Sequence, residues 1–249
     1  MKSDPSLPAV KGLLENSLIE WPGKICVVLF LGGCNFRCPF CHSRQLVKGE
    51  GGGESIPFES VRGILSEHAG WIDGVVVSGG EPTIAPGLRE LMLQLKGLGL
   101  KTRVNTNGSR PGVLKSLAEE GLLDSVAMDV KGPLDERYHA LAGVQVDLAA
   151  LSETIDWLLG GGVGEVEFRT TVVPSMLSDG DVRDMARRLG GTADLVLQPF
   201  RPLDCLDERC MSLPAVKVDE LVKLSEEAGQ FVRNCRVRGA VASTASRSE

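Results

Sequence analysis

The sequence of 249 residues predicts an α/β fold in which a parallel sheet is wound with outer helices. Short apolar, β-branched runs predict strands, and segments of helical period lie between them. This alternation repeats six times along the chain. Parallel strands need long crossover connections, usually helices, so six strand–helix units in order imply a parallel sheet.

Each predicted unit is a strand followed by a helix. The continuous apolar run at 26–31 indicates a strand buried on both faces, and the later runs are similar. The strands are expected at residues 26–31, 74–77, 102–106, 125–130, 165–173 and 194–199. The helices are expected at residues 60–68, 87–98, 111–120, 148–159, 179–189 and 218–229. An open doubly wound sheet and a partial barrel give the same alternation, so periodicity alone leaves both open.

Length and charge limit the class of protein. Barrels of this length commonly form one domain, so we expect a single domain over residues 1–249, with a core at about 12–239. The 27 Lys and Arg against 33 Asp and Glu give a net charge of −6, which argues against an extended nucleic-acid surface. The polar tail 243–249 is expected to fray, and the glycine-rich segment 49–55 to connect flexibly.

The sequence also favours a cytoplasmic protein without a membrane partner. The N-terminus has no signal-peptide pattern, and no stretch approaches the roughly 20 apolar residues that span a bilayer. The seven cysteines are an odd number with three crowded together, which does not fit a secreted disulfide framework. A reducing compartment fits this pattern.

Three cysteines, Cys34, Cys38 and Cys41, follow the first predicted strand directly. A cubane iron–sulfur cluster has four irons, and each iron takes a terminal ligand. Three thiolates leave one iron open, where a small molecule can chelate through an amine and a carboxylate. A structural zinc site and three buried thiols remain alternatives for these cysteines.

Two further groups of residues follow the next predicted strands. Gly79 and Gly80 let the backbone approach a ligand closely, and Glu81 adds an acceptor, although an ordinary turn explains the glycines as well. Asp129 and Lys131 end the fourth predicted strand. The lysine can bind a carboxylate and the aspartate can orient it or hold a cation, or both can simply be solvated.

The cysteine spacing, with Phe40 before the last cysteine and Gly-Gly-Glu-Pro one unit later, resembles the radical S-adenosylmethionine (SAM) superfamily. The resemblance implies a partial (β/α)6 TIM-like barrel with its chemistry at the carboxyl ends of the strands. It also implies a [4Fe–4S] cluster on Cys34, Cys38 and Cys41, and no further catalytic residue is assigned. The expected SAM contacts are Phe40, His42, Gly79, Gly80, Glu81, Asn105, Asp129 and Lys131.

Segments 17–24, 168–174 and 197–202 extend the resemblance to activating enzymes of glycyl-radical proteins, most closely the long-form activator of anaerobic ribonucleoside-triphosphate reductase. Asn105 stands where related activators often carry an aspartate. The resemblance implies reductive cleavage of SAM, a 5′-deoxyadenosyl radical and a glycyl radical installed on a partner enzyme. It also implies anaerobic physiology and a flavodoxin or ferredoxin as external electron donor.

Other functions remain open. The partner can be another glycyl-radical enzyme of the pyruvate formate-lyase type. A radical SAM enzyme that acts on a small molecule, for example in a pterin-related ring contraction, has the same cluster. From a different class, a non-catalytic Cys₃ metal-binding module remains. Cys205, Cys210 and Cys235 are interpreted as free thiols in preference to ligands of a second cluster.

Overall fold

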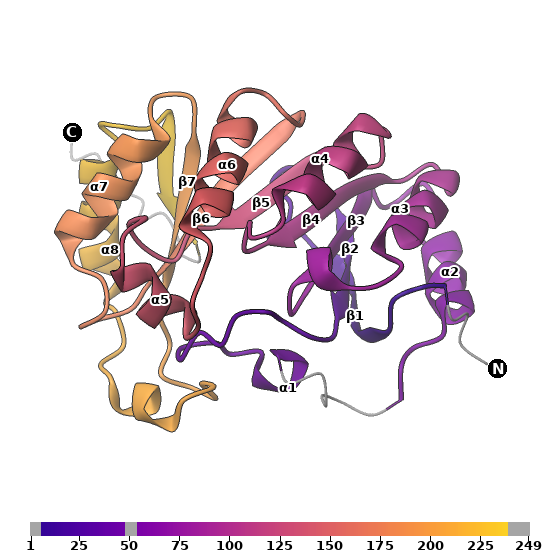
Figure 1. Cartoon of the computed structure of the whole chain (residues 1–249). Helices are drawn as coiled ribbons and strands as arrows, with labels where there is room; N and C mark the ends of the chain where they lie inside the picture. Colours follow the sequence, from indigo (N-terminus) through magenta and orange to yellow (C-terminus); the bar gives the residue numbers. More distant parts are fainter. Residues whose placement is uncertain (1–5, 48–53, 239–249) are drawn as a thin grey trace, which may run out of the picture.

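The structure, a computed structural model, describes residues 6–47 and 54–238. It is built on an eight-stranded sheet whose strands follow one another in sequence order, from β1 to β8. Strand β1 runs antiparallel to β2, and each later neighbouring pair is parallel. Strands β1 and β8 are the two ends of this order, so the curved sheet forms a barrel that is not closed by strand pairing (Figure 1).

The strands and helices have the following bounds. The strands are β1 Val10–Ser17, β2 Cys26–Leu31, β3 Gly74–Gly79, β4 Lys101–Thr106, β5 Ser125–Asp129, β6 Glu165–Val172, β7 Asp194–Pro199 and β8 Asn234–Val237. The helices are α1 Arg44–Val47, α2 Phe58–Glu67, α3 Leu88–Gly97, α4 Pro111–Glu119, α5 Arg137–Ala142, α6 Leu148–Leu159, α7 Asp179–Leu189 and α8 Val218–Ala228. Two short 3₁₀ turns are η1 Pro82–Ile84 and η2 Glu208–Ser212.

The six predicted strand–helix units are confirmed. They are β2–α2, β3–α3, β4–α4, β5–α6, β6–α7 and β7–α8, with bounds within two residues of those expected. Strands β1 and β8 and helices α1 and α5 were not predicted from the sequence. Strand β1 is half exposed and β8 has four residues, so neither carries the continuous apolar run that marks a buried parallel strand.

The core follows from the alternation of side chains along the strands. In β2, Val27 and Leu29 belong to the large core that includes the helices, whereas Cys26 and Val28 pack with Trp21 in a second, smaller cluster. Because successive side chains of a strand point to opposite faces, both faces of β2 are buried. Figure 1 shows α2, α3 and α4 on the outer side of the curved sheet.

Several helices begin at polar caps. Asp147 accepts hydrogen bonds from the backbone N–H groups of Ala149 and Ala150 at the start of α6. Ser178 and Asp181 form a reciprocal capping box at the start of α7. Such caps satisfy N–H groups that have no partner within the helix, which explains why α6 and α7 begin where the sequence predicts.

Two earlier expectations concern segments that lie outside the described residues: the tail 243–249, and residues 49–53 of the glycine-rich connection. Among the helices of the described part of the chain, none has the length and hydropathy needed to cross a bilayer.

Candidate active site at the carboxyl ends of the strands

One cavity, of about 550 Å³, gathers every residue that the sequence singled out for a cluster or for SAM. The residues come from the loop after β2, from the ends of β3, β4 and β5, and from the segments that follow them. This edge is where the active sites of barrel enzymes lie. The structure therefore brings the predicted residues together at the expected place.

Backbone hydrogen bonds hold the loop with the three cysteines, residues 33–43, in place. The N–H of Gly33 donates to the carbonyl oxygen of Leu46 in α1 at 2.7 Å, and the N–H of Arg37 donates to that of Ala142 at the end of α5 at 2.8 Å. The N–H of Cys41 donates to the carbonyl oxygen of Cys38 at 3.0 Å, which folds the loop back on itself. The short helices α1 and α5 therefore fix the loop at both sides.

The three thiols are largely removed from water. Burial raises the pKa of Cys34 to about 11 and that of Cys38 to about 12, and it also raises the pKa of Cys41. Free of metal, these thiols hold their protons at neutral pH, and metal binding must release them. No three Cys, His, Asp or Glu side chains of the described residues are arranged for a single metal ion. A cubane cluster does not require this arrangement, because each cysteine binds a different iron.

The glycines after β3 bring that segment against the cysteine loop. The N–H of Gly80 donates to the carbonyl oxygen of Leu31 at 2.9 Å, and the N–H of Glu81 donates to that of Gly33 at 2.8 Å. A Cβ on Gly80 would lie 1.9 Å from the oxygen of Gly33, and Gly79 has a φ of +119°. The N–H groups of Gly80 and Glu81 therefore bond to the end of β2 and to the start of the cysteine loop, and the contacts of Gly79 and Gly80 with SAM stay a prediction.

Glu81 is only 1% exposed and is surrounded by protein donors. Its Oε1 accepts from the N–H of Thr83 at 3.0 Å and from the hydroxyls of Thr83 and Thr106 at 2.6 and 2.7 Å. Its Oε2 accepts from the N–H of Asn107 at 2.6 Å. Burial raises the pKa of Glu81, while these donors oppose that shift. The side chain thus fixes η1 against the end of β4, and its contact with SAM stays a prediction.

Asp129 and Lys131 form an ion pair on the cavity wall. The Lys131 Nζ lies 3.2 Å from Oδ2 of Asp129, and the lysine side chain is 14% exposed. Burial lowers the pKa of Lys131, but Asp129 and the nearby Cys38 and Cys41 outweigh burial and raise it overall. The ammonium therefore remains charged at neutral pH and can pair with the carboxylate of a ligand.

Asn105 offers an acceptor to the cavity. Its Nδ2 donates to Oε2 of Glu20 at 3.1 Å and to the hydroxyl of Ser78 at 3.3 Å. Its Oδ1 is buried and has no hydrogen-bond partner among the described residues. A buried acceptor without a partner is costly, so this oxygen suits a hydroxyl or amine of a bound ligand.

The aromatic residues of the cysteine loop are fixed in the cavity wall. Phe40 is 5% exposed. The His42 Nε2 lies 2.7 Å from the carbonyl oxygen of Arg201, and its ring stacks on Phe200 with centroids 6.1 Å apart. These contacts hold His42 on the cavity lining, and its contact with SAM stays a prediction.

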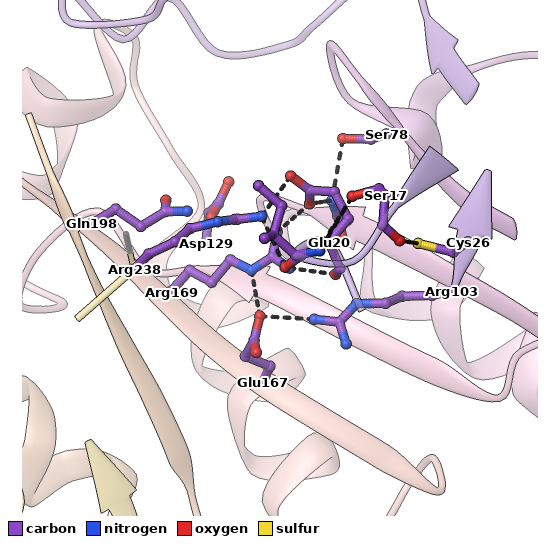
Figure 2. A network of polar contacts seen from close by, with 12 residues as sticks. Ser17, Glu20, Cys26, Ser78, Arg103, Asp129, Glu167, Arg169, Gln198 and Arg238 are labelled. Carbon is purple, nitrogen blue, oxygen red and sulfur yellow. Dashed lines mark hydrogen bonds and ion pairs between the residues drawn. The ribbon is translucent and has the colours of Figure 1, made fainter. Parts of the chain in front are cut away.

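A network of charged side chains lies inside the barrel (Figure 2), and it was not predicted from the sequence. The Glu20 carboxylate accepts from Arg169 Nη1 at 3.1 Å and from Arg238 Nη2 at 2.6 Å. Glu167 Oε1 accepts from Arg169 Nε at 2.5 Å and from Arg103 Nη2 at 2.9 Å. Glu20, Arg169 and Arg238 also line the cavity.

Burial alone would raise the pKa of Glu20, but Arg169 and Arg238 outweigh it and lower the pKa below the ordinary value. Arg103 and Arg169 are themselves buried inside strands that were predicted to be apolar. Charged residues two apart in such strands, as at Glu167 and Arg169, are the sequence signal for a polar barrel interior.

The three cysteines that follow β7 do not line this cavity. Cys205, Cys210 and Cys235 are free thiols, and the first two are buried. Like the loop cysteines, they belong to no single-ion ligand group within the described parts of the chain. Their interpretation as free thiols stays a prediction.

Comparison with known proteins identifies the class. The sequence profile of the Radical SAM superfamily matches residues 28–189, and the chain belongs to this superfamily. Its relatives include activating enzymes of glycyl-radical enzymes. The chain is 31% identical over 92% of its length to MJ1227 of Methanocaldococcus jannaschii, a candidate glycyl-radical enzyme activating enzyme, and covers 95% of that protein. It is 28% identical over 74% of its length to the pyruvate formate-lyase 1-activating enzyme of Escherichia coli K12, and covers 77% of it.

Solved structures of other proteins have a similar fold. SuiB of Streptococcus suis, bound to the precursor peptide SuiA, has a TM-score of 0.63 at 16% identity. The match covers 86% of this chain and 48% of the SuiB chain, so this protein spans about half the length of SuiB. A domain of a pyruvate-formate lyase-activating enzyme from Bacteroides vulgatus has a TM-score of 0.53 at 13% identity, over 67% of this chain and 99% of that one. These likenesses concern the fold alone.

Radical SAM enzymes use a [4Fe–4S] cluster and SAM, and this chain is such an enzyme. The residues of the cavity fit both groups. Three thiols, a charged ammonium and an acceptor without a partner line one cavity. This donor set matches a cluster with one open iron and a ligand that carries a carboxylate and hydroxyl or amine groups.

Proposed function

We propose that this chain activates a glycyl-radical enzyme, with Cys34, Cys38 and Cys41 as the three cluster ligands. When bound, the reduced cluster and SAM together supply a 5′-deoxyadenosyl radical, which can remove the Cα hydrogen of a glycine. The observation that carries the proposal is the convergence of the cysteines, the Asp129–Lys131 pair and the unpartnered Asn105 oxygen on one cavity.

The chain's own residues bind and orient the cofactor. Lys131 pairs with the SAM carboxylate, and Asp129 holds the ammonium in place. Asn105 accepts from a hydroxyl or amine through its Oδ1. Gly79 and Gly80 let the β3 segment lie directly against the cysteine loop. A ligand bound at this segment therefore lies next to the cysteines. The network around Glu20 keeps charged side chains fixed in the cavity wall.

The substrate we propose is a segment of a partner protein, in line with the activating enzymes among the relatives. A reactive radical must be kept from water, so the substrate segment has to close the cavity. We assign anaerobic ribonucleoside-triphosphate reductase as the partner, on the resemblance of segments 17–24, 168–174 and 197–202. One continuous sheet over the described strands supports a single domain for the whole reaction.

A partner of the pyruvate formate-lyase type is the second candidate, because activating enzymes of that lyase are among the relatives. The test incubates the cluster-loaded chain with SAM, dithionite and either the anaerobic reductase or pyruvate formate-lyase, without oxygen. EPR then detects a glycyl radical. A radical only on the reductase supports the first partner, and a radical only on the lyase supports the second.

The same assay distinguishes the remaining candidate functions. Release of 5′-deoxyadenosine with no radical on either protein would point to a small-molecule substrate. Stoichiometric zinc and no cleavage of SAM would instead support the metal-binding module.

A further inference from the structure

The side-chain amide of Asn105 has two possible orientations, and its neighbours select one of them. Its Nδ2 donates to Oε2 of Glu20 at 3.1 Å and to the hydroxyl of Ser78 at 3.3 Å. An ionised carboxylate only accepts hydrogen bonds, whereas a hydroxyl can either accept or donate. Glu20 is therefore the neighbour that decides the orientation. It requires the nitrogen on its own side, which leaves Oδ1 without a protein partner among the described residues.

The reverse orientation of this amide is unfavourable on both sides. It would place Oδ1 of Asn105 beside the carboxylate of Glu20, so that two acceptors would meet. It would also turn Nδ2 away from its acceptors, and a buried donor without a partner costs free energy. A donor group of a bound ligand would then meet N–H groups in place of an acceptor. The carboxylate of Glu20 thus determines which kind of ligand group Asn105 can bind.

Two arginines keep Glu20 in its ionised form. Arg238 Nη2 donates to Oε1 of Glu20 at 2.6 Å, Arg169 Nη1 donates to Oε2 at 3.1 Å, and Figure 2 shows both side chains converging on Glu20. Burial alone would raise the pKa of Glu20, but the two guanidinium groups outweigh burial and lower it. A protonated carboxyl group could donate to an amide oxygen and allow the reverse orientation, but the ionised form has no hydrogen to donate.

The backbone around Glu20 is fixed as well. Ser17, the last residue of β1, accepts through Oγ from the N–H groups of Ile19 and Glu20 at 3.4 and 3.2 Å. Arg169 Nη2 donates to the carbonyl oxygen of Glu20 at 2.9 Å, and Arg238 Nη2 donates to that of Ile19 at 3.1 Å. The carboxylate therefore cannot withdraw from the amide without the loss of several hydrogen bonds.

We propose that Glu20 is a positioning residue for SAM, which holds the Asn105 amide so that its oxygen is left to accept a hydrogen bond from the ligand. The inference rests on the proposed function, in which Asn105 binds SAM. Glu20 acts through Asn105, and its own partner Arg238 follows the last strand, β8. Residues near both ends of the sheet order thus contribute to one ligand contact.

The test measures the dissociation constant of SAM by equilibrium dialysis of the cluster-loaded chain. Asn105→Ala should raise this constant roughly fivefold, because the ligand loses one hydrogen bond. Glu20→Gln should raise it by a similar factor, because the new amide can donate to the Asn105 oxygen and stabilise the reverse orientation. Glu20→Gln should have no further effect in the Asn105→Ala background, since no amide is left to orient.

This cycle distinguishes positioning from the other effects of Glu20. Loss of its negative charge would weaken binding of the sulfonium ligand whether asparagine or alanine stands at position 105. A general loss of order in the cavity would do the same. Equal effects of Glu20→Gln in the two backgrounds would therefore overturn the proposal.

Aspartate at position 105 provides a second comparison. Both oxygens of an aspartate accept hydrogen bonds, so its orientation does not change what the ligand meets. Asn105→Asp and the double variant Glu20→Gln/Asn105→Asp should therefore have equal dissociation constants for SAM. This comparison does not depend on the stability of Glu20→Gln alone, because the double variant keeps one carboxylate in the pair. Weaker binding by the double variant would contradict the positioning role.

Glu165→Gln is the matched control. Glu165 accepts from Trp21 Nε1 at 2.7 Å and so holds the residue next to Glu20, but it does not line the cavity. Its dissociation constant for SAM should equal that of the parent. Unchanged affinity in Asn105→Ala would contradict the proposed function at this site. A loss in Asn105→Ala that Glu20→Gln does not reproduce would overturn the positioning role alone, so the two failures are distinguishable.

Discussion

Lys131 is the residue whose charge we expect to matter most for SAM. Its ammonium lies on the cavity wall, 3.2 Å from Asp129. Lys131→Met keeps the length of the side chain but removes the charge. We expect SAM to bind about 10- to 100-fold more weakly, because a hydrogen bond to a charged group contributes about 1.5–3 kcal/mol. Equilibrium dialysis of the cluster-loaded chain measures this change.

Lys96→Met is the control for this variant. Lys96 forms a similar ion pair with Asp124, at 2.8 Å, away from the reaction cavity. Its loss should leave the dissociation constant of SAM unchanged. Equal SAM affinity of Lys131→Met and Lys96→Met would remove Lys131 from the binding site.

The pKa of Glu20 makes stability depend on pH. Burial raises it, but Arg169 and Arg238 outweigh burial and hold it below its ordinary value of 4.5. A carboxylate with a lowered pKa in the folded state stabilises the fold above its ordinary pKa, and this contribution is lost as pH falls through the folded pKa. Glu20→Gln should lower the free energy of unfolding by about 1–3 kcal/mol at neutral pH and by much less in acid.

Urea unfolding of the cluster-free chain at several pH values tests this expectation. Glu59→Gln is the control, because Glu59 pairs with Arg62 on the exposed surface of α2, where ion pairs contribute about 0–1 kcal/mol. If Glu20→Gln lost the same stability at acid and neutral pH, the effect of Glu20 would come from packing and not from its charge.

At the scale of elements, the contact between the β3 segment and the cysteine loop depends on Gly80. A Cβ there would lie 1.9 Å from the carbonyl oxygen of Gly33. Gly80→Ala should therefore displace the cysteine loop, lower stability by about 1–3 kcal/mol and reduce the iron retained per chain. Thermal unfolding and iron analysis measure the two effects.

Gly63→Ala provides the comparison for Gly80→Ala. Gly63 lies within α2, and a Cβ there would meet no atom within 4 Å. Alanine should stabilise the helix by up to about 1 kcal/mol and leave the iron content unchanged. Unchanged iron in Gly80→Ala would mean that the cysteine loop does not depend on this close approach.

The elements that the sequence predicts well are those with a strong local signal. The bounds of β2, α6, α7 and β7 match the expected ranges. Strand β8 gave no such signal, because Asn234–Val237 is short and polar, and its Arg236 instead pairs with the distant Glu167. Contacts between residues this far apart in the chain leave no local pattern in the sequence.

At the scale of the whole molecule, an ion pair bridges the open side of the barrel. Arg238 follows the last strand, and its Nη2 lies 2.6 Å from Glu20, which follows the first strand. Because β1 and β8 are the unpaired ends of the sheet, this contact links the two ends. Arg238→Met should speed hydrogen exchange in β8 about tenfold and leave β3 unchanged.

The comparison for this prediction is Arg233→Met, since Arg233 pairs with Asp194 on the surface and does not bridge the sheet ends. Hydrogen exchange in β8 should change little in this variant. Equal acceleration by both substitutions would show that any arginine near β8 matters, and that the link to Glu20 does not.

The sequence predicts which motifs form the candidate site, but it predicts few of the contacts between their side chains. The cysteines, Asn105 and Lys131 all reach the cavity, because motifs at the carboxyl ends of neighbouring parallel strands meet at one edge. The role of Glu81 as a buried acceptor for Thr83, Thr106 and Asn107 was not predictable. It depends on the pairing of loops, which the sequence does not encode locally.

The most direct measurement is of iron, sulfide and SAM cleavage in the anaerobically reconstituted chain. We predict about four irons per chain and dithionite-driven release of 5′-deoxyadenosine. Cys34→Ala, Cys38→Ala and Cys41→Ala should each abolish the release, while Cys235→Ala, which alters a cysteine of β8, should not. Zinc in place of iron, or cleavage that survives loss of any one of the three cysteines, would contradict the account.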